Sequence, residues 1–483
     1  MDRLRLAELL AGLSLVADMG MGLDPGQAAR AALLATELAA AADAEEPQHV
    51  YYTALLQHVG CTAYAHEAGR LFGGDEIAVK RAAVHLESAD GQDRGLVEGY
   101  SRANCEVAAR MAERVGLGPG VVRALLDVYE HWDGSGGPRR LRGEAISQTA
   151  RIAQVAATAA LFHHEGGVDR AAEAVRRRAG GLLDPRLAEA VRPLIGVLDV
   201  ADPLESAVAA EPAPAILVSE PGLDRVCRAF GEAVDLKTPL HHGHATGVCE
   251  LAGAAAERAG LAPAAVVGLR RAALLHDIGR AAIPNGVWER PGPLTWADQE
   301  RVRLHAYHSE RVLARSGPLG ELAPLAGMHH ERLDGSGYHR QAPAAAIGLQ
   351  ARILAAADVF QAMTQTRAHR PARSGDAAAD VLVAEARAGR LDADAVHAVL
   401  DAAGERPAAF RRERPAGLTE RQVEVLRLVA QGLSNPQIAE RLVISRRTAE
   451  RHVQDVYARI GVSTRAGAAL FAMEHDLLAA QDS

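Results

Sequence analysis

The sequence predicts an all-α protein. Alanine, leucine and arginine dominate its 483 residues, and all three favour helices. Aromatic residues make up only 4% of the chain, and runs of the residues that favour strands are scarce. A chain of this length corresponds to about three domains of roughly 150 residues each. We therefore expect about three helical domains.

The bulk properties exclude several classes of protein. The net charge of −8 means that any affinity for DNA must be local. None of the four cysteines forms a CxxC pair, which argues against a cysteine-type zinc site and favours reduced thiols in the cytosol. The chain has neither the apolar core of a signal peptide nor an apolar run of 18 residues. We expect a cytoplasmic protein that makes no membrane contact.

Two linkers divide the chain. "ADPLESAVAAEPAPA" (201–215) is rich in proline and alanine, and "GERPAAFRRERPAG" (404–417) is charged and flanked by proline. The domains predicted from these linkers are residues 1–205, 216–404 and 416–483.

The first two domains look like copies of one unit. "AISQTARIAQVA" begins at residue 145 and "AIGLQARILAAA" at residue 346, 201 residues later. The peptide "DGSG" occurs at 133–136 and again at 334–337, with the same separation. A constant offset across separate motifs argues for duplication, and the segments between them read as amphipathic helices.

Histidines and acids gather in the second copy only. Imidazole and carboxylate groups suit Fe, Mn or Zn, and an acid that bridges suits a site with two metal ions. The adjacent pair His329–His330 cannot both point the same way on one helix. It serves either one ion each, or one ion and the substrate. The candidate ligands are His244, His276, Asp277, His305, His329, His330 and Asp358.

The second copy resembles a known enzyme family. "HDIGRAAIP", "HAYHSERVL", "HHERLDGSGY" and "ARILAAADVFQAMT" are similar, in order and spacing, to the motifs of the HD-GYP phosphohydrolases over about residues 230–372. The resemblance implies a helical fold that binds two or three metal ions, usually iron or manganese, and in many members cleaves cyclic di-GMP. It implies the seven ligands named above, with Asp277 as the bridging carboxylate. Arg332 and Tyr338 would face the substrate phosphates, and Arg352 would support the site.

The second copy also departs from the family pattern. Arg280 stands where the family has a lysine beside the catalytic Asp277, and arginine is larger and forked. His339 replaces the proline of GYP, and Gln361 replaces an aspartate. A glutamate that gives some members a third ion is Leu240 here, so two ions are expected.

The first copy has lost the corresponding ligands. The backbone glycines of its "DGSG" turn remain, so the scaffold survives without the chemistry. We expect this copy either to pack against the second as a pseudo-dimer or to sense a small molecule in a vacant pocket. The residues at the ligand positions are Gln27, Gln57, His58, Val128, Tyr129 and Ala157.

The third domain reads as four helices. Thr419 with Gln422 forms a capping box, and Gly432 closes the first helix. "NPQIAERL" (435–442) is a short amphipathic helix, and Ser445 caps the next one. That helix has a buried apolar stripe opposite a basic face. The pattern predicts a helix-turn-helix with a recognition helix for the major groove.

The third domain resembles the LuxR-type DNA-binding domain over residues 416–475. The resemblance implies that Glu450, Arg451 and Gln454 reach base edges of double-stranded DNA. It also implies phosphate contacts from the segment 446–448. One copy should bind weakly, so we expect a homodimer, formed through the helix from about 465 to 478 and the HD blocks. The predicted phosphate contacts are Arg446, Arg447 and Thr448.

Two functional interpretations remain open. In the first, the chain is a transcription regulator whose second copy is a metal-dependent phosphohydrolase acting on a cyclic dinucleotide or another nucleotide phosphoester. In the second, that copy binds a metal or nucleotide without turnover and controls DNA binding. A purely structural scaffold would require the histidines to be accidental.

Overall fold

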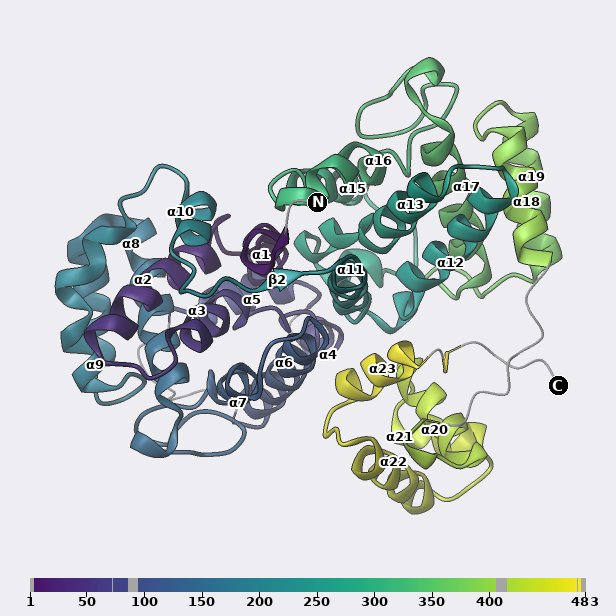
Figure 1. The fold of residues 1–483 in the computed structure, drawn as a ribbon. Coiled ribbons are helices and arrows are strands. Elements are labelled where there is room, and N and C mark those ends of the chain that lie inside the picture. The colour runs from purple at the N-terminus through teal and green to yellow at the C-terminus, as the bar shows by residue number, and fades with distance from the viewer. Residues whose placement is uncertain (1–3, 72, 86–93, 405–414, 476, 479–483) are drawn as a thin grey trace. The chain divides into compact units, whose positions relative to one another are not determined.

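The protein is helical, as the sequence predicts. The computed structural model describes residues 4–71, 73–85, 94–404, 415–475 and 477–478 (Figure 1). These residues belong to two compact units, the first formed by Met1–Val226 with Arg315–Gly320 and the second by Cys227–Ala314 with Glu321–Ser483. In the described part of the chain, no helix has the length and apolar character needed to cross a bilayer.

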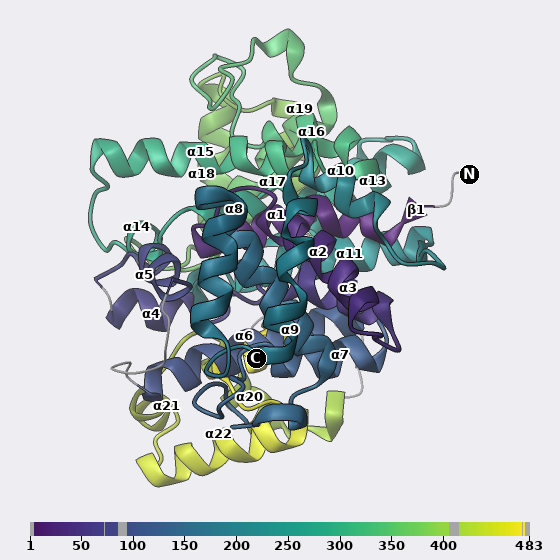
Figure 2. The ribbon, with the colours of Figure 1, turned by 90° about the vertical axis from the view of Figure 1, so that its left-hand side faces the viewer.

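The first unit is a helical bundle with one small antiparallel pair of strands. Strands β1 (Leu4–Arg5) and β2 (Leu217–Val218) pair with Leu4 opposite Val218. Helices α3 and α8 both pack against α2, which buries Leu34 and Leu38 completely (Figure 2). The helices are α1 (Leu6–Met21), α2 (Gln27–Ala41), α3 (Pro47–Leu56), α4 (Ala65–Leu71), α5 (Glu76–Ala83), α6 (Arg94–Arg114), α7 (Pro119–Asp127), η1 (Gly143–Ala145), α8 (Gln148–Arg178), α9 (Pro185–Ala190), η2 (Arg192–Leu198) and α10 (Pro203–Ala209).

Helix α10 lies inside the segment 201–215, which was expected to be a linker. Asp202 accepts hydrogen bonds from the backbone N–H groups of Leu204 and Glu205, and Pro203 occupies the first turn. Leu204 and Ala207 are buried. A cap and two buried apolar residues are therefore enough to make a helix in a sequence rich in alanine and proline. Most of the second expected linker, residues 405–414, lies outside the described residues.

The second unit repeats the helical plan and adds a separate set of C-terminal helices. Helix α12 packs against α13, α17 and α19, and η4 packs against α15. The elements up to the second linker are α11 (Glu220–Asp235), η3 (Pro239–His241), α12 (His244–Arg258), α13 (Pro263–Leu275), η4 (Ile278–Ala282), α14 (Asn285–Trp288), α15 (Trp296–Leu313), η5 (Gly317–Leu322), α16 (Ala323–Gly327), η6 (Ala344–Ala346), α17 (Leu349–Thr364), α18 (Gly375–Arg387) and α19 (Ala393–Gly404).

A buried carboxylate caps the same helix in each copy. Asp18 accepts hydrogen bonds from the backbone N–H groups of residues 26–28 at 2.8–3.1 Å, at the start of α2. Asp235 accepts from the backbone N–H of Ala245 at 2.9 Å, at the start of α12. Burial raises the pKa of both carboxyl groups to about 7. These caps fix the helix starts at which the first candidate ligand stands in one copy and a glutamine in the other.

The "DGSG" loops are also built alike. The carboxylate of Glu331 accepts backbone N–H bonds from Arg340 and Ala342 at 2.7 and 2.8 Å, and Glu130 accepts from positions 139 and 141 at 2.8 Å. In each loop an aspartate accepts from the N–H two residues later, and the glycine after it has φ near +80°. The loop carboxylates and glycines are therefore common to both copies, whereas the histidine pair His329–His330 occurs in one copy only.

The C-terminal helices match the sequence prediction. The capping box of Thr419 and Gln422 opens α20, and Ser445 accepts from the N–H of Thr448 at the start of α22. Gly432 has a positive φ of 82° just after α20. The elements are η7 (Pro415–Gly417), α20 (Glu420–Ala430), α21 (Asn435–Arg441), α22 (Arg446–Ile460) and α23 (Arg465–Glu474).

Candidate metal centre and nucleic-acid interface

The seven candidate metal ligands come from five separate helices. His244 is the first residue of α12, and His276–Asp277 directly follow α13. His305 lies within α15, His329–His330 follow α16, and Asp358 lies within α17. Six of the seven side chains are buried, and His330 is partly exposed.

Four of these residues form the first cluster. His244, His276, Asp277 and Asp358 each offer a ligand atom, and these atoms all lie within 4.8 Å of one another. His244 Nε2 lies 3.1 Å from Asp358 Oδ1 and 3.4 Å from Asp277 Oδ2. His276 Nε2 lies 3.0 Å from the same Asp277 Oδ2. Two imidazoles and two carboxylates thus meet at one point.

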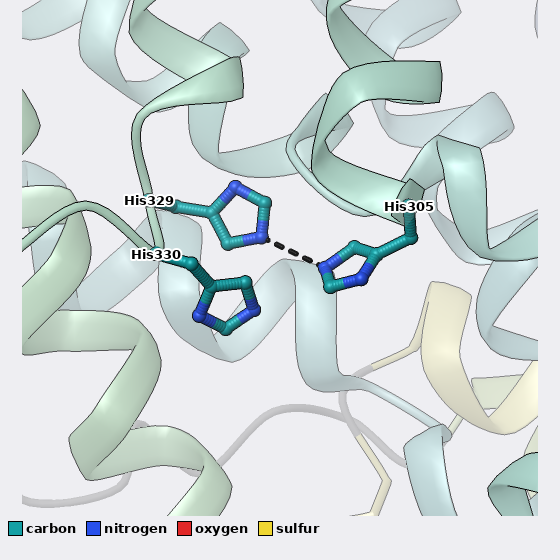
Figure 3. A group of neighbouring side chains, drawn as sticks. All are labelled: His305, His329 and His330. Atoms are coloured by element: carbon teal, nitrogen blue, oxygen red, sulfur yellow. Dashed lines mark hydrogen bonds between the residues drawn. The ribbon is translucent and has the colours of Figure 1, made fainter. Parts of the chain in front are cut away.

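Three histidines form the second cluster. The rings of His305, His329 and His330 face a common space, and His305 Nε2 lies 3.1 Å from His329 Nε2 (Figure 3). Asp277 Oδ1 lies 3.2 Å from His305 Nε2 and 3.5 Å from His329 Nε2. Asp277 therefore turns one oxygen to each cluster.

The side chains fit a metal centre. His276 Nε2 and Asp277 Oδ1 are buried without a well-formed hydrogen bond to any described residue, and Asp277 Oδ2 has the ion pair with Arg280 at 2.7 Å. Buried polar atoms are rarely left in this state unless an ion or water satisfies them. Imidazole nitrogens with carboxylate oxygens suit divalent transition metals. The clusters are typical of metal sites in HD domains.

The charges around Asp277 favour a carboxylate. Burial alone would raise the pKa of Asp277, but the positive charges of Arg280 and His276 hold it well below its usual value. Burial lowers the pKa of His329 to about 4 and that of His330 well below the usual value. Metal binding requires neutral imidazole and ionised carboxylate, and the shifts of Asp277, His329 and His330 favour these states. At His276 burial would lower the pKa, but the charges of Asp277 and Asp358 raise it to about 10, so a metal ion binding there would displace a proton.

Arg280 lies against the clusters. It is buried, and its Nη2 lies 2.7 Å from Asp277 Oδ2. The guanidinium carbon lies 5.2 Å from the centre of the Trp288 ring. Its Nε and Nη1 atoms find no hydrogen-bond acceptor in the described part of the chain. Two donors therefore remain for an anion.

Arg332 and Tyr338 lie beside the second cluster. The guanidinium of Arg332 donates to the backbone carbonyls of His329 (3.3 Å) and Glu331 (2.8 Å). The ring of Tyr338 lies 4.7 Å from that of His330 at 33°, centroid to centroid. Burial raises the pKa of Tyr338 above its usual value, so the phenol keeps its proton and remains a donor.

The described part of the first copy has other side chains where the second copy has its candidate ligands. Among its described residues, no three His, Cys, Asp or Glu side chains converge closely enough to hold an ion. Gln57 and His58 follow α3 as His276–Asp277 follow α13. His58 Nδ1 lies 3.1 Å from the hydroxyl of Tyr129, to which Asn104 donates at 2.6 Å. A hydrogen-bonded polar set thus occupies the place of the ligands.

Sequence reasoning missed two residues near the clusters. Asp235, which caps α12, is a single acid on an amphipathic helix and gave no signal. Arg367 donates to the backbone carbonyl of Leu240, and burial lowers its pKa to about 9. It stands in "TQTRAHRP", a basic stretch directly after the helix of Asp358, and this position could have suggested it.

The predicted DNA-reading side chains share one face of α22. Ala449, Val453, Val456 and Ile460 are buried beneath that helix. The residues predicted to meet DNA lie on its outer side, where five are exposed and Thr448 is partly exposed. These side chains are Arg446, Arg447, Thr448, Glu450, Arg451 and Gln454.

The chain has two HD-type bundles in tandem, and one of them has the histidine–aspartate clusters. A helix-turn-helix follows them. This is the class of proteins in which an HD phosphohydrolase fold is joined to a DNA-binding domain. The family model "HD domain" matches residues 27–187 and 228–395, and "Bacterial regulatory proteins, luxR family" matches residues 416–472. The chain belongs to the HD domain family, with two HD-GYP-like copies and a C-terminal LuxR-type DNA-binding domain.

Known relatives of the HD part include cyclic dinucleotide phosphodiesterases. The 3'3'-cGAMP-specific phosphodiesterase 3 of Vibrio cholerae is 30% identical over 414 residues, which cover 78% of this chain and 90% of the relative. A cyclic di-GMP phosphodiesterase of Thermotoga maritima is 37% identical over 147 residues, 30% of this chain and 39% of the relative. A crystal structure of a cyclic GMP-AMP-specific phosphodiesterase from V. cholerae superimposes with a TM-score of 0.61 at 25% identity. The superposition covers 83% of this chain and 98% of the V. cholerae chain.

Proposed function

We propose that the chain is a DNA-binding regulator whose second HD copy hydrolyses a phosphodiester of a cyclic dinucleotide. The observation that carries this proposal is the position of Asp277, which turns one carboxylate oxygen to each of two histidine clusters. In this proposal the copy that lacks the metal ligands is residues 1–205. The catalytic copy is residues 216–404, and the DNA-binding domain is residues 416–483.

The clusters would hold two divalent ions, with iron or manganese as the candidates. His244, His276 and Asp358 would bind one, the three histidines of the second cluster would bind the other, and Asp277 would bridge. Bound ions of this kind act as Lewis acids toward phosphoryl oxygens and make a water molecule more acidic.

The remaining residues act on the substrate. Arg280 keeps two donors free beside Asp277 and would bind a phosphate oxygen through its planar fork. Tyr338, held protonated by burial, would donate a hydrogen bond to the same dinucleotide. Arg332 is anchored to the backbone, so its charge would orient the phosphate without leaving its carbonyl partners.

The cyclic dinucleotide 3'3'-cGAMP is the first substrate to test. The V. cholerae phosphodiesterase named for it aligns along 90% of its own length, which supports the choice over a match to one domain only. Cyclic di-GMP is the second substrate to test, because the T. maritima relative is named as a cyclic di-GMP phosphodiesterase.

The DNA-binding domain supplies the output. We infer that Glu450, Arg451 and Gln454 read bases and that Arg446, Arg447 and Thr448 hold phosphates, with two chains binding one operator as a homodimer. The exposed positions of these side chains on α22 support this assignment.

A matched pair of variants tests the proposal. Manganese- or iron-loaded protein is incubated with 3'3'-cGAMP, cyclic di-GMP and cyclic di-AMP, and the linear products are separated by chromatography. Asp277→Asn should reduce turnover to background and lower the metal content, whereas His58→Gln, at the equivalent place in the first copy, should leave both unchanged. Unchanged metal content in Asp277→Asn would contradict the proposed site.

The alternative function is sensing without turnover. The replacement of the family lysine by Arg280, which is ion-paired with Asp277, favours it. Metal-loaded protein that binds a cyclic dinucleotide but releases no linear product would establish sensing and reject hydrolysis.

A further inference from the structure

Three ligand histidines have their outward ring nitrogens held by their own helices. His276 Nδ1 donates to the carbonyl of Ala273 at 2.7 Å, and His329 Nδ1 donates to that of Ala326 at 2.6 Å. His305 Nδ1 does the same with the carbonyl three residues earlier. Each therefore carries its proton on Nδ1 and presents Nε2 to the clusters.

His244 cannot use this device. It is the first residue of α12, so the carbonyl three residues earlier belongs to η3 and not to its own helix. Its Nδ1 instead lies 3.0 Å from Oε1 of Gln365, the residue that follows α17. Its Nε2 faces Asp358 and Asp277.

The partners of Gln365 fix which end of its amide faces His244. Arg367 Nη2 donates to Gln365 Oε1 at 3.1 Å, and Gln365 Nε2 donates to the carbonyl of His242 at 3.4 Å. A guanidinium has only donors and a carbonyl only accepts, so the amide oxygen must point toward His244. An oxygen 3.0 Å from Nδ1 requires a proton on that nitrogen. Arg367 Nη2 also lies 3.4 Å from Nδ1, a contact that by itself would favour an unprotonated Nδ1. Two shorter contacts oppose it, because Gln365 Oε1 lies 3.0 Å from Nδ1 and accepts from Arg367 Nη2 at 3.1 Å.

We propose that Gln365, braced by Arg367 and the carbonyl of His242, is the positioning residue that holds His244 in the Nδ1–H tautomer and aims its Nε2 at the metal centre. The proposal rests on the metal site of the proposed function. Partners of this kind raise the affinity of a metal site about 10- to 100-fold by orienting a ligand before the ion arrives.

The test compares two glutamine-to-methionine changes, one within α17 at Gln350 and one directly after it at Gln365. Gln365→Met keeps the length of the side chain and removes the acceptor. Gln350→Met is the control, since Gln350 lies on the same helix and loses only a bond to the carbonyl of Ala265 (2.9 Å). Gln365→Glu restores an acceptor at the same atom.

Metal-free proteins are titrated with Mn²⁺, and thermal unfolding is followed in parallel. Gln365→Met should bind Mn²⁺ about 10- to 100-fold more weakly than wild type. Gln350→Met and Gln365→Glu should stay within a few-fold of wild type, and the metal-free melting temperatures of the two methionine variants should be alike. Equal affinity in Gln365→Met and Gln350→Met, or failure of Gln365→Glu to restore binding, would overturn the inference.

A measurement on the unaltered chain guards against a variant that fails to fold. Nitrogen-15 NMR of Zn²⁺-loaded wild type should find the His244 proton on Nδ1, and a proton on Nε2 would overturn the assignment. Wild type that binds no metal would instead reject the proposed function itself. Wild type that binds metal, with no loss in Gln365→Met, would reject only the role of Gln365.

Discussion

Single residues distinguish the copy with the histidine–aspartate clusters from the copy without them. The two copies keep the same capping carboxylate and the same loop carboxylate. They differ where a ring or acid faces the interior: Gln57 and His58 stand where His276 and Asp277 stand in the second copy. Because Asp277 turns one oxygen to each cluster, its loss alone removes a side chain common to both.

His58 makes the stability of the first unit depend on pH. Burial lowers the pKa of His58 to about 4, below the usual 6.5, so the unfolded chain takes up a proton at this residue before the folded chain does. Stability from this source is complete above pH 6.5 and is lost as the pH falls toward 4. The shift corresponds to at most about 3 kcal/mol.

We expect His58→Gln to flatten this pH dependence. The urea midpoint of the wild type should fall between pH 6.5 and 4 more steeply than that of the variant. His164→Gln, at an exposed histidine of the same unit, is the control and should follow the wild type. Parallel profiles for all three proteins would show that His58 is not the source.

The seven candidate ligands could be named from the sequence, but Gln365, which contacts one of them, and Asp235 could not. The HD motif and the histidine pair stand at fixed places along the chain, so the seven candidate ligands could be named. Gln365 acts through one hydrogen bond to a residue 121 positions away, and Asp235 acts through a backbone N–H. Neither position has a periodic or compositional signal in a single sequence.

At the scale of elements, the loops and caps explain what was predicted and what was missed. Helix starts with a clear cap, such as Thr419 and Ser445, were predicted correctly. Helix α10 was missed because proline and alanine also suit a linker, and the burial that decides between them depends on the rest of the unit. Local signals therefore predict ends of helices better than they predict which short segments pack.

The two loop carboxylates offer a matched test. Glu331→Gln and Glu130→Gln each turn an amide N–H₂ toward backbone donors, which should cost about 1–3 kcal/mol of stability. Only Glu331 supports the loop that carries Tyr338. Glu331→Gln should therefore also lower turnover of the best cyclic dinucleotide, while Glu130→Gln should not. Equal turnover in both variants would refute a link between the loop and the site.

Substitutions on α22 should separate base contacts from phosphate contacts. On a DNA site selected from a random pool, Arg451→Ala should lose about 1–3 kcal/mol and relax the preference for one base. Arg447→Ala should weaken binding to all sequences and reduce the salt dependence by about one ion. Arg421→Ala, at an arginine paired with Glu424 on α20, should change neither property. Identical effects of the Arg451 and Arg447 changes would contradict the division between base and phosphate contacts.

For the whole molecule, one chain combines two HD domains with a LuxR-type DNA-binding domain. If the two are coupled, a cyclic dinucleotide must change the affinity for DNA, and DNA must change the affinity for the dinucleotide by the same factor. A phosphorothioate analogue that resists hydrolysis separates binding from turnover.

We expect the saturating analogue to shift the DNA dissociation constant of metal-loaded protein by about 5- to 150-fold. Fluorescence anisotropy with labelled DNA measures this shift, and the reciprocal titration checks its size. Asp277→Asn should show a smaller shift. An unchanged DNA affinity at saturating analogue would mean that the two parts work independently.

The repeated "DGSG" loop has a practical consequence. Because the loop carboxylate and glycines recur in a copy with the histidine pair and in a copy without it, the chain contains an internal reference for its own mutagenesis. A substitution can be made at matching places in both halves of one polypeptide, under one set of conditions. A substitution that has the same effect in both copies acts on folding. A substitution that has an effect only in the second copy acts on the proposed metal site.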